Sequence, residues 1–152
     1  MNQIADLLPP SNIVLDLAVD TKVRLFDAMG KLFERNAGLS ANVVASSLGA
    51  REKLGSTGLG QGIAIPHGRI KGLQKALGAF VRLHTPIAFD APDAKPVTQI
   101  FILLVPEHAT EEHLQLLSEL AQMFSERSFR EKLALAASPE ELAALFRAWQ
   151  AA

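Results

Sequence analysis

The sequence contains no cysteine, no large excess of either charge and no long hydrophobic run. Without cysteine the chain cannot form disulfides or bind a metal through thiolates, and this absence fits a reducing cytoplasm. A formal net charge of −1 gives no electrostatic support for binding nucleic acid or an anionic membrane surface. No segment approaches the roughly 20 apolar residues of a membrane helix, and the N-terminus lacks the features of a signal peptide. We therefore expect a cytoplasmic protein with no membrane insertion and no nucleic-acid partner.

The remaining composition is that of an ordinary globular domain. The chain has 152 residues, of which 49% are hydrophobic and 20% charged, so it is long enough to bury one substantial core. It contains no internal repeat and no low-complexity segment. We predict a single domain across residues 1–152, with residues 1–11 as an N-terminal lead-in.

Capping residues and apolar spacing predict the helices. Asp20 or Thr21 precedes a helix that ends before Gly38, and Ser40 precedes a second helix. Thr110 precedes a long helix, and Ser138 followed by proline begins the last one. The predicted helices span approximately residues 21–36, 41–54, 110–125, 128–136 and 139 onward.

Four apolar segments predict strands, at residues 12–17, 63–65, 76–83 and 98–105. The last is almost continuously apolar, which is typical of a central strand covered on both faces. Two prolines in residues 85–94 predict an irregular or edge connection there. Strands separated by helices or long connections indicate an α/β sandwich with a mixed sheet flanked by helices, and the strand order stays open.

Residues 54–69 carry five of the ten glycines of the chain. Successive backbone amides in such a loop can form a nest for an anion, which favours a phosphate-related function. The loop lacks the Gly-Lys-Ser/Thr ending of a Walker motif, and it follows a helix and leads into a strand, unlike a dinucleotide fingerprint. A flexible helix-to-strand turn is the alternative. The candidate phosphoryl-binding residues of the loop are Ser56, Thr57, Gly60, Gln61 and Gly62.

His67 follows this loop, between Pro66 and Gly68. A neutral imidazole can attack phosphorus with one nitrogen if an acceptor holds the proton of the other nitrogen. His67 is therefore a candidate nucleophile, and an ordinary loop histidine is the alternative.

Arg51 lies at helical spacing from Val44 and Leu48, on the apolar stripe of its helix and one turn before the loop. A guanidinium in that position is costly unless it meets an anion or a carboxylate. It is a candidate for binding the same phosphoryl group. The alternative is a side chain that extends to solvent at the helix end.

His113 lies at helical spacing from Leu117, Leu120 and Phe124, in the first turn of a helix. Its ring is a candidate hydrogen-bond donor to the same site, and a core-edge histidine is the alternative. His84 and His108 are predicted to lie on the surface. The acidic and histidine residues at 107–113 lack the i, i+4 histidine pair of a zinc helix, so no metal is expected.

The segment REKLGSTGLGQGIAIPHGR, at residues 51–69, resembles the IIA components of the bacterial phosphoenolpyruvate phosphotransferase system. The fructose/mannitol class fits, and within it the nitrogen-regulatory branch is the most similar. The segments TPIAFDAPDAKPV and FILLVPEHATEEHLQLLSELAQMF extend the resemblance to about residues 13–149. It implies a mixed five-stranded sheet flanked by helices, His67 as the phosphoryl acceptor, His113 and Arg51 as active-site partners, and no cofactor.

The resemblance also implies the function. His67 is expected to accept a phosphoryl group from a phosphohistidine on an HPr-like carrier protein. The phosphorylation state then regulates target proteins such as transporters or kinases, a role that the short chain favours. One alternative is a sugar-specific IIA that passes the phosphoryl group to a IIB component. Another is a module that binds a phosphate metabolite without covalent transfer.

Overall fold

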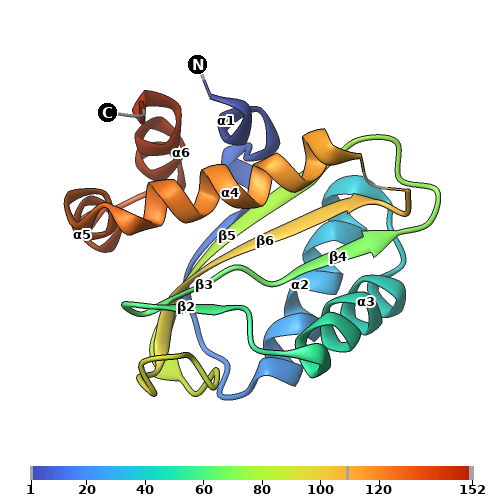
Figure 1. Cartoon of the computed structure of the whole chain (residues 1–152), viewed down its shortest axis with the longest axis horizontal. Coiled ribbons are helices and arrows are strands. Elements are labelled where there is room, and N and C mark those ends of the chain that lie inside the picture. Colours follow the sequence, from blue (N-terminus) through green and yellow to red (C-terminus); the bar gives the residue numbers. More distant parts are fainter. Residues whose placement is uncertain (1, 109, 151–152) are drawn as a thin grey trace.

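A computed structural model of the chain describes residues 2–108 and 110–150. Its strands form one sheet that lies between two groups of helices (Figure 1). Every helix of the described residues is too short or too polar to span a bilayer. In chain order the elements are α1 (Gln3–Leu7), the 3-10 helix η1 (Pro10–Asn12), β1 (Ile13–Leu17), α2 (Lys22–Ala37), α3 (Ala41–Leu54), β2 (Gly58–Gly60), β3 (Ile63–Ala64), β4 (His67–Ile70), β5 (Leu77–Ile87), β6 (Val97–Pro106), α4 (Glu111–Ser125), α5 (Arg127–Leu135) and α6 (Pro139–Ala148).

Strand β6 is the centre of a mixed sheet with the order β1-β5-β6-β3-β2. It pairs antiparallel with β5 on one side, and parallel with β3 and then β4 on the other side. Residues 100–104 of β6 are fully buried, as predicted for a strand covered on both faces. The predicted α/β sandwich with a mixed sheet is confirmed. Among the described residues the sheet has six strands, because β3 and β4 share one side of β6.

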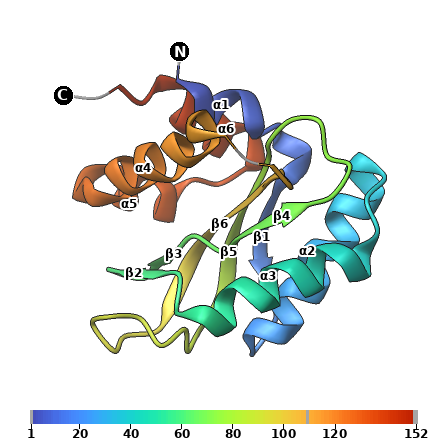
Figure 2. The same ribbon diagram turned by 45° about the vertical axis from the view of Figure 1, so that its right-hand side comes forward.

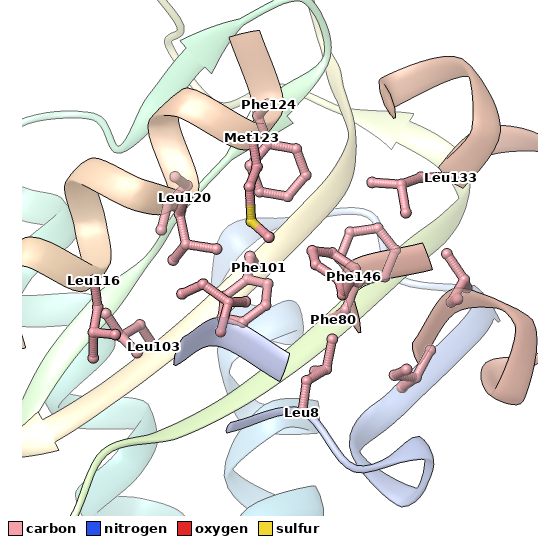
Figure 3. Packing of buried hydrophobic residues seen from close by; sticks show 14 of the residues in the cluster. Leu8, Phe80, Phe101, Leu103, Leu116, Leu120, Met123, Phe124, Leu133 and Phe146 are labelled. Atoms are coloured by element: carbon pink, nitrogen blue, oxygen red, sulfur yellow. The ribbon is translucent and has the colours of Figure 1, made fainter. Parts of the chain in front are cut away.

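The two faces of the sheet are covered by different helices. Helices α2 and α3 cover one face, and α1, α4, α5 and α6 cover the other (Figures 1 and 2). On the second face the ring of Phe146 packs edge-on against Phe80, with 5.4 Å between ring centroids (Figure 3). The Asn2 side chain donates a hydrogen bond of 2.7 Å to the Phe146 carbonyl. The two ends of the described chain therefore lie side by side on this face.

Several helices begin and end where the sequence predicts. Thr21, Ser40 and Ser138 precede α2, α3 and α6, and each side chain accepts a hydrogen bond from the backbone N–H three residues later. Gly38 ends α2 with a φ of 70°, a left-handed conformation that glycine adopts at little cost. These short-range contacts explain why the helix boundaries could be predicted.

Strand β5 is longer than predicted. The sequence predicts an irregular connection from residue 85 because of its prolines, but β5 continues to Ile87. The register between β5 and β6 shifts between Arg82 and Ile87, and a strand irregularity accepts a proline that has no N–H to donate. Residues 85–87 therefore belong to β5 and not to the connection, whereas the predicted irregularity is present in the pairing of this part of β5 with β6.

The N-terminal lead-in contains a helix that the sequence analysis does not predict. Asn2 accepts a hydrogen bond from the Ala5 N–H and so caps α1. Ile4 and Leu8 are 0% and 3% exposed and belong to the core beneath α4 and α6. Five helical residues are too few for a periodic pattern, so only the tertiary contacts reveal this element.

Gly30 of α2 and Gly49 of α3 offer a matched pair of substitutions. A Cβ at Gly30 would lie 2.4 Å from the carbonyl oxygen of Ala41, whereas nothing lies within 4 Å of one at Gly49. We expect Gly30→Ala to lower the free energy of unfolding by roughly 2 kcal/mol, because the start of α3 must move. Gly49→Ala should raise it by about 1 kcal/mol, because alanine is the better helix former. Urea unfolding measures both changes, and changes of the same sign would contradict the close packing of α2 on α3.

Candidate active site

His67 is the first residue of β4, where it lies opposite Leu103 of β6. Its side chain is partly exposed at the edge of the sheet. The next residue, Gly68, allows α3 to approach closely, since a Cβ there would lie 2.4 Å from Ser47 Oγ. This contact brings the last turns of α3, and with them Arg51, to the histidine.

The hydrogen bonds of His67 define its tautomer. Nδ1 lies 3.0 Å from the carbonyl oxygen of Ile65. Because a carbonyl oxygen can only accept, Nδ1 carries the ring proton. Arg51 Nε donates to Nε2 over 3.2 Å, so Nε2 presents its lone pair to the guanidinium. The same guanidinium donates through Nη1 to the Gly55 carbonyl at 2.8 Å, which holds it at the end of α3.

The surroundings of His67 favour the neutral ring. Burial lowers its pKa below the ordinary value of 6.5, and this is the largest effect. The hydrogen bond to Ile65 raises the pKa, the positive charge of Arg51 lowers it, and the negative charge of Glu52 raises it. The net change is downward, so at neutral pH the imidazole is uncharged and can act as a nucleophile.

The lowered pKa of His67 predicts a specific pH dependence. Between the folded-state pKa and 6.5, residue 67 binds more protons in the unfolded chain than in the folded chain. Its contribution to stability is therefore fully present above pH 6.5 and is lost as the pH falls through the folded-state pKa. We expect an NMR titration of the His67 ring to have its midpoint below 6.5, and Arg51→Met to raise that midpoint. A midpoint at or above 6.5 in the unmodified chain would contradict this description of the site.

A pocket of about 400 Å³ opens in front of His67. Arg51 from α3, His67 from β4 and His113 from α4 all line it, so the structure brings together the three residues that the sequence analysis selects. Leu54 and Leu114 also line the pocket, and they are 85% and 53% exposed. The pocket therefore holds basic side chains, and Leu54 and Leu114 give it an exposed apolar rim that a protein surface could cover.

His113 has a defined tautomer as well. It is the third residue of α4, and its Nδ1 accepts a hydrogen bond of 3.1 Å from the backbone N–H of Thr110. An accepting Nδ1 leaves the proton of the neutral ring on Nε2. His113 can therefore donate a hydrogen bond from Nε2, and the start of a helix is favourable for a nearby negative charge.

The glycine loop has a different place from the one predicted. Strands β2 and β3 pair antiparallel with Gly60 opposite Ile63, so Gln61 and Gly62 form a two-residue hairpin turn. Both turn residues have positive φ, 58° and 79°, as a type I′ turn requires. The Gln61 N–H donates to Asp93 Oδ2 over 2.9 Å. None of Gly60, Gln61 and Gly62 lines the His67 pocket, so the structure does not bring these amides to the histidine.

Ser56 and Thr57, the other two predicted loop residues, also lie outside this pocket. The Ser56 hydroxyl donates to the Phe89 carbonyl. Both the backbone N–H and the hydroxyl of Thr57 donate to the carboxylate of Glu52. Sequence reasoning missed Glu52, because a charged residue in the last turn of a helix usually lies in solvent.

The other candidate ligands do not assemble into a site. His84 and His108 are exposed, as predicted. Across residues 2–108 and 110–150, no three histidine, cysteine or acidic side chains lie together in a way that could hold a metal ion. The chemistry that the pocket can perform therefore depends on one nucleophilic imidazole, one guanidinium and one second imidazole.

Known proteins are similar to this chain over most of its length. The nitrogen regulatory protein of Pseudomonas aeruginosa is 41% identical over 143 residues, which are 93% of each chain. The crystal structure of nitrogen regulatory protein IIA-Ntr from Neisseria meningitidis matches with a TM-score of 0.89 at 57% identity, over 95% of this chain and 99% of that one. The fructose-specific EIIA component of the phosphotransferase system of Haloferax volcanii is 39% identical over 127 residues, 84% of this chain and 73% of its own.

The family described as "Phosphoenolpyruvate-dependent sugar phosphotransferase system, EIIA 2" matches residues 6–149. That segment holds the complete sheet and every residue of the His67 pocket. The resemblance to the nitrogen-regulatory branch, predicted from residues 51–69, is confirmed. By sequence and by fold, the chain belongs to the EIIA 2 family of the phosphoenolpyruvate-dependent phosphotransferase system.

Proposed function

We propose that His67 accepts a phosphoryl group on Nε2 from a phosphohistidine of an HPr-like carrier protein, and that this modification regulates target proteins. The observation that carries the proposal is the pair of hydrogen bonds at the two ring nitrogens of His67. Its Nδ1 proton is held by the Ile65 carbonyl, while the Nε2 lone pair faces Arg51 in an open pocket. This is the arrangement that a nucleophilic imidazole needs.

The transfer passes phosphorus from one nitrogen to another. The lone pair of His67 Nε2 forms the new P–N bond while the P–N bond of the donor breaks, and the electron pair of that bond stays on the donor nitrogen. The Nδ1 proton remains on the ring, shared with the Ile65 carbonyl. Atoms and electrons balance without a cofactor, so the protein contributes positioning and electrostatic stabilisation.

Arg51 and His113 stabilise the charge of the transferred group. The Arg51 guanidinium leaves Nε2 as phosphorus arrives and donates to the phosphoryl oxygens, where hydrogen bonds between charged groups are strong. The Nε2–H of His113, which lines the same pocket, is a second donor. With the glycine hairpin outside the pocket, these two side chains carry the role that the sequence analysis gives to loop amides.

Phosphorylation changes the surface that partners meet. A phosphoryl group adds about −1.5 to −2 charges to the pocket, next to the apolar rim of Leu54 and Leu114. A target that packs on this rim must then bury or pair that charge, so its affinity depends on the modification. In a cytoplasmic protein of the nitrogen-regulatory branch, the targets are transporters, kinases or other enzymes.

Intact-mass measurement tests the proposal. The chain is incubated with phosphoenolpyruvate, the general first enzyme of the system and the HPr-like carrier. We expect one acid-labile phosphoryl adduct, and pull-downs with the two forms should retain different proteins. An unmodified chain, under conditions that phosphorylate a known EIIA protein, would overturn the proposal and leave non-covalent binding of a phosphate metabolite as the alternative.

A sugar-specific role is the second candidate, and the similarity to a fructose-specific EIIA component favours it. The chemistry at His67 is then the same, but the phosphoryl group continues to the cysteine of a IIB protein. Sugar-dependent labelling of a IIB cysteine by the phosphorylated chain would support this role. Regulation without such labelling would support the first candidate.

A further inference from the structure

Glu52 and Thr57 are buried behind the His67 pocket without lining it. They are 9% and 6% exposed. Glu52 follows Arg51 on α3, and successive helical residues point about 100° apart around the axis. Arg51 therefore reaches the pocket, whereas Glu52 turns to the interior beside the β2–β3 hairpin. A buried carboxylate is costly unless it is paired.

Both oxygens of the Glu52 carboxylate have hydrogen-bond partners. Oε1 accepts a hydrogen bond of 2.6 Å from Thr57 Oγ1, and Oε2 accepts one of 3.1 Å from the Thr57 N–H. Lys22 Nζ lies 2.9 Å from Oε2 and supplies the opposite charge. Lys22 is also 3.6 Å from the exposed carboxylate of Asp90. Two of these contacts are made by one residue, Thr57, and they hold it against the end of α3.

Thr57 connects this carboxylate to His67 through the backbone. The Thr57 carbonyl accepts a hydrogen bond of 3.0 Å from the Ile65 N–H. The Ile65 carbonyl in turn lies 3.0 Å from His67 Nδ1. The end of α3 is thus linked to both ring nitrogens. Arg51 contacts Nε2 directly, and Glu52 is connected to Nδ1 through Thr57 and Ile65.

We infer that Glu52 is a positioning residue that keeps His67 in the tautomer with a free Nε2 lone pair. Through Thr57 it fixes the Ile65 carbonyl, and the hydrogen bond at one imidazole nitrogen sets which nitrogen carries the proton. The effect on the tautomer stands on the contacts alone. The effect on phosphoryl transfer rests on the proposed function.

Three variants, Glu52→Gln, Thr57→Val and Thr57→Ser, and one control test this inference. Glu52→Gln keeps the shape but loses the charge and one acceptor, and Thr57→Val removes only the hydroxyl bond to Oε1. Asp90→Asn is the matched control, because it neutralises the other carboxylate near Lys22 and leaves Thr57 untouched. Long-range ¹H–¹⁵N NMR of the His67 ring reports the tautomer in each protein.

Phosphoramidate serves as a donor that needs no partner protein. Its P–N bond breaks, ammonia leaves and phosphorus bonds to His67 Nε2. We expect Glu52→Gln to populate the second tautomer and to slow labelling roughly tenfold, less than the ~100-fold that a misplacement of 1 Å can cost. Thr57→Val should change the tautomer and the labelling rate in the same direction but by less. Thr57→Ser keeps the hydroxyl and should therefore keep the tautomer of the unmodified chain. Asp90→Asn should change neither the tautomer nor the labelling rate.

The effect of Glu52 on the tautomer and the proposed phosphoryl transfer can fail separately. A single Nδ1–H tautomer and unchanged labelling in folded Glu52→Gln and Thr57→Val would overturn the inference. If Glu52→Gln does not fold, as judged by circular dichroism, Thr57→Val decides alone. If phosphoramidate and the carrier both fail to label the unmodified chain, the proposed function fails, and the NMR tautomers still decide the role of Glu52.

Discussion

Replacing His67 with alanine is expected to abolish phosphoryl uptake and to leave the fold intact. The substitution removes the nucleophilic nitrogen, and none of the other three histidines combines an acceptor at Nδ1 with a guanidinium at Nε2 among the described hydrogen bonds. The ring is partly exposed and its bond to the Ile65 carbonyl contributes about 1 kcal/mol, so the chain should remain folded. Intact mass after incubation with phosphoenolpyruvate, first enzyme and carrier should show no adduct.

His84→Ala is the matched control for this experiment. His84 is exposed in the second half of β5 and does not line the pocket. It should accept the phosphoryl group as the unmodified chain does. A phosphoryl adduct of normal yield in His67→Ala would place the acceptor elsewhere and remove the basis of the proposed function.

Replacing Arg51 with alanine is expected to slow transfer by roughly 100-fold without preventing it. Loss of one preorganised donor to a developing oxyanion has effects of that size. Arg51→Lys should recover only part of the rate, because an ammonium keeps the charge but not the planar fork of donors. Rapid-quench measurement of phosphoryl transfer from the carrier gives the rate for each variant.

Arg127→Ala is the control for the loss of one positive charge. Arg127 lies on α5, is 84% exposed and pairs with Glu131, so its loss should not affect transfer. If Arg51→Ala and Arg127→Ala transferred at the same rate as the unmodified chain, Arg51 would have no role at the phosphoryl group.

The convergence of the active-site residues could be predicted because each follows a simple geometric rule. Arg51 and His113 occupy apolar stripes of their helices, and the 3.6-residue period places such residues toward the sheet. His67 follows a short apolar segment and Pro66, and the structure places it on β4 at the sheet edge. Helix periodicity and local backbone restriction are properties of short segments, so they are visible in one sequence.

The glycine hairpin and Glu52 could not be predicted for related reasons. Strands β2 and β3 contain three and two residues, too few to show an alternating pattern. From the sequence alone, the glycines of this turn therefore predict an anion-binding loop and not a hairpin. Burial of Glu52 depends on Lys22, which is thirty residues away and reaches it only when α2 packs on α3. Long-range pairing of charges leaves no local pattern.

The central claim is that Nε2 of His67 is the phosphoryl acceptor, and the position of phosphorus on the ring tests it most directly. The chain is labelled with ¹⁵N in histidine, phosphorylated through the carrier and studied by ³¹P and ¹⁵N NMR. We predict coupling of phosphorus to Nε2 of His67, with the proton remaining on Nδ1. Coupling of phosphorus to Nδ1 of His67, or to a nitrogen of any other histidine, would contradict the account.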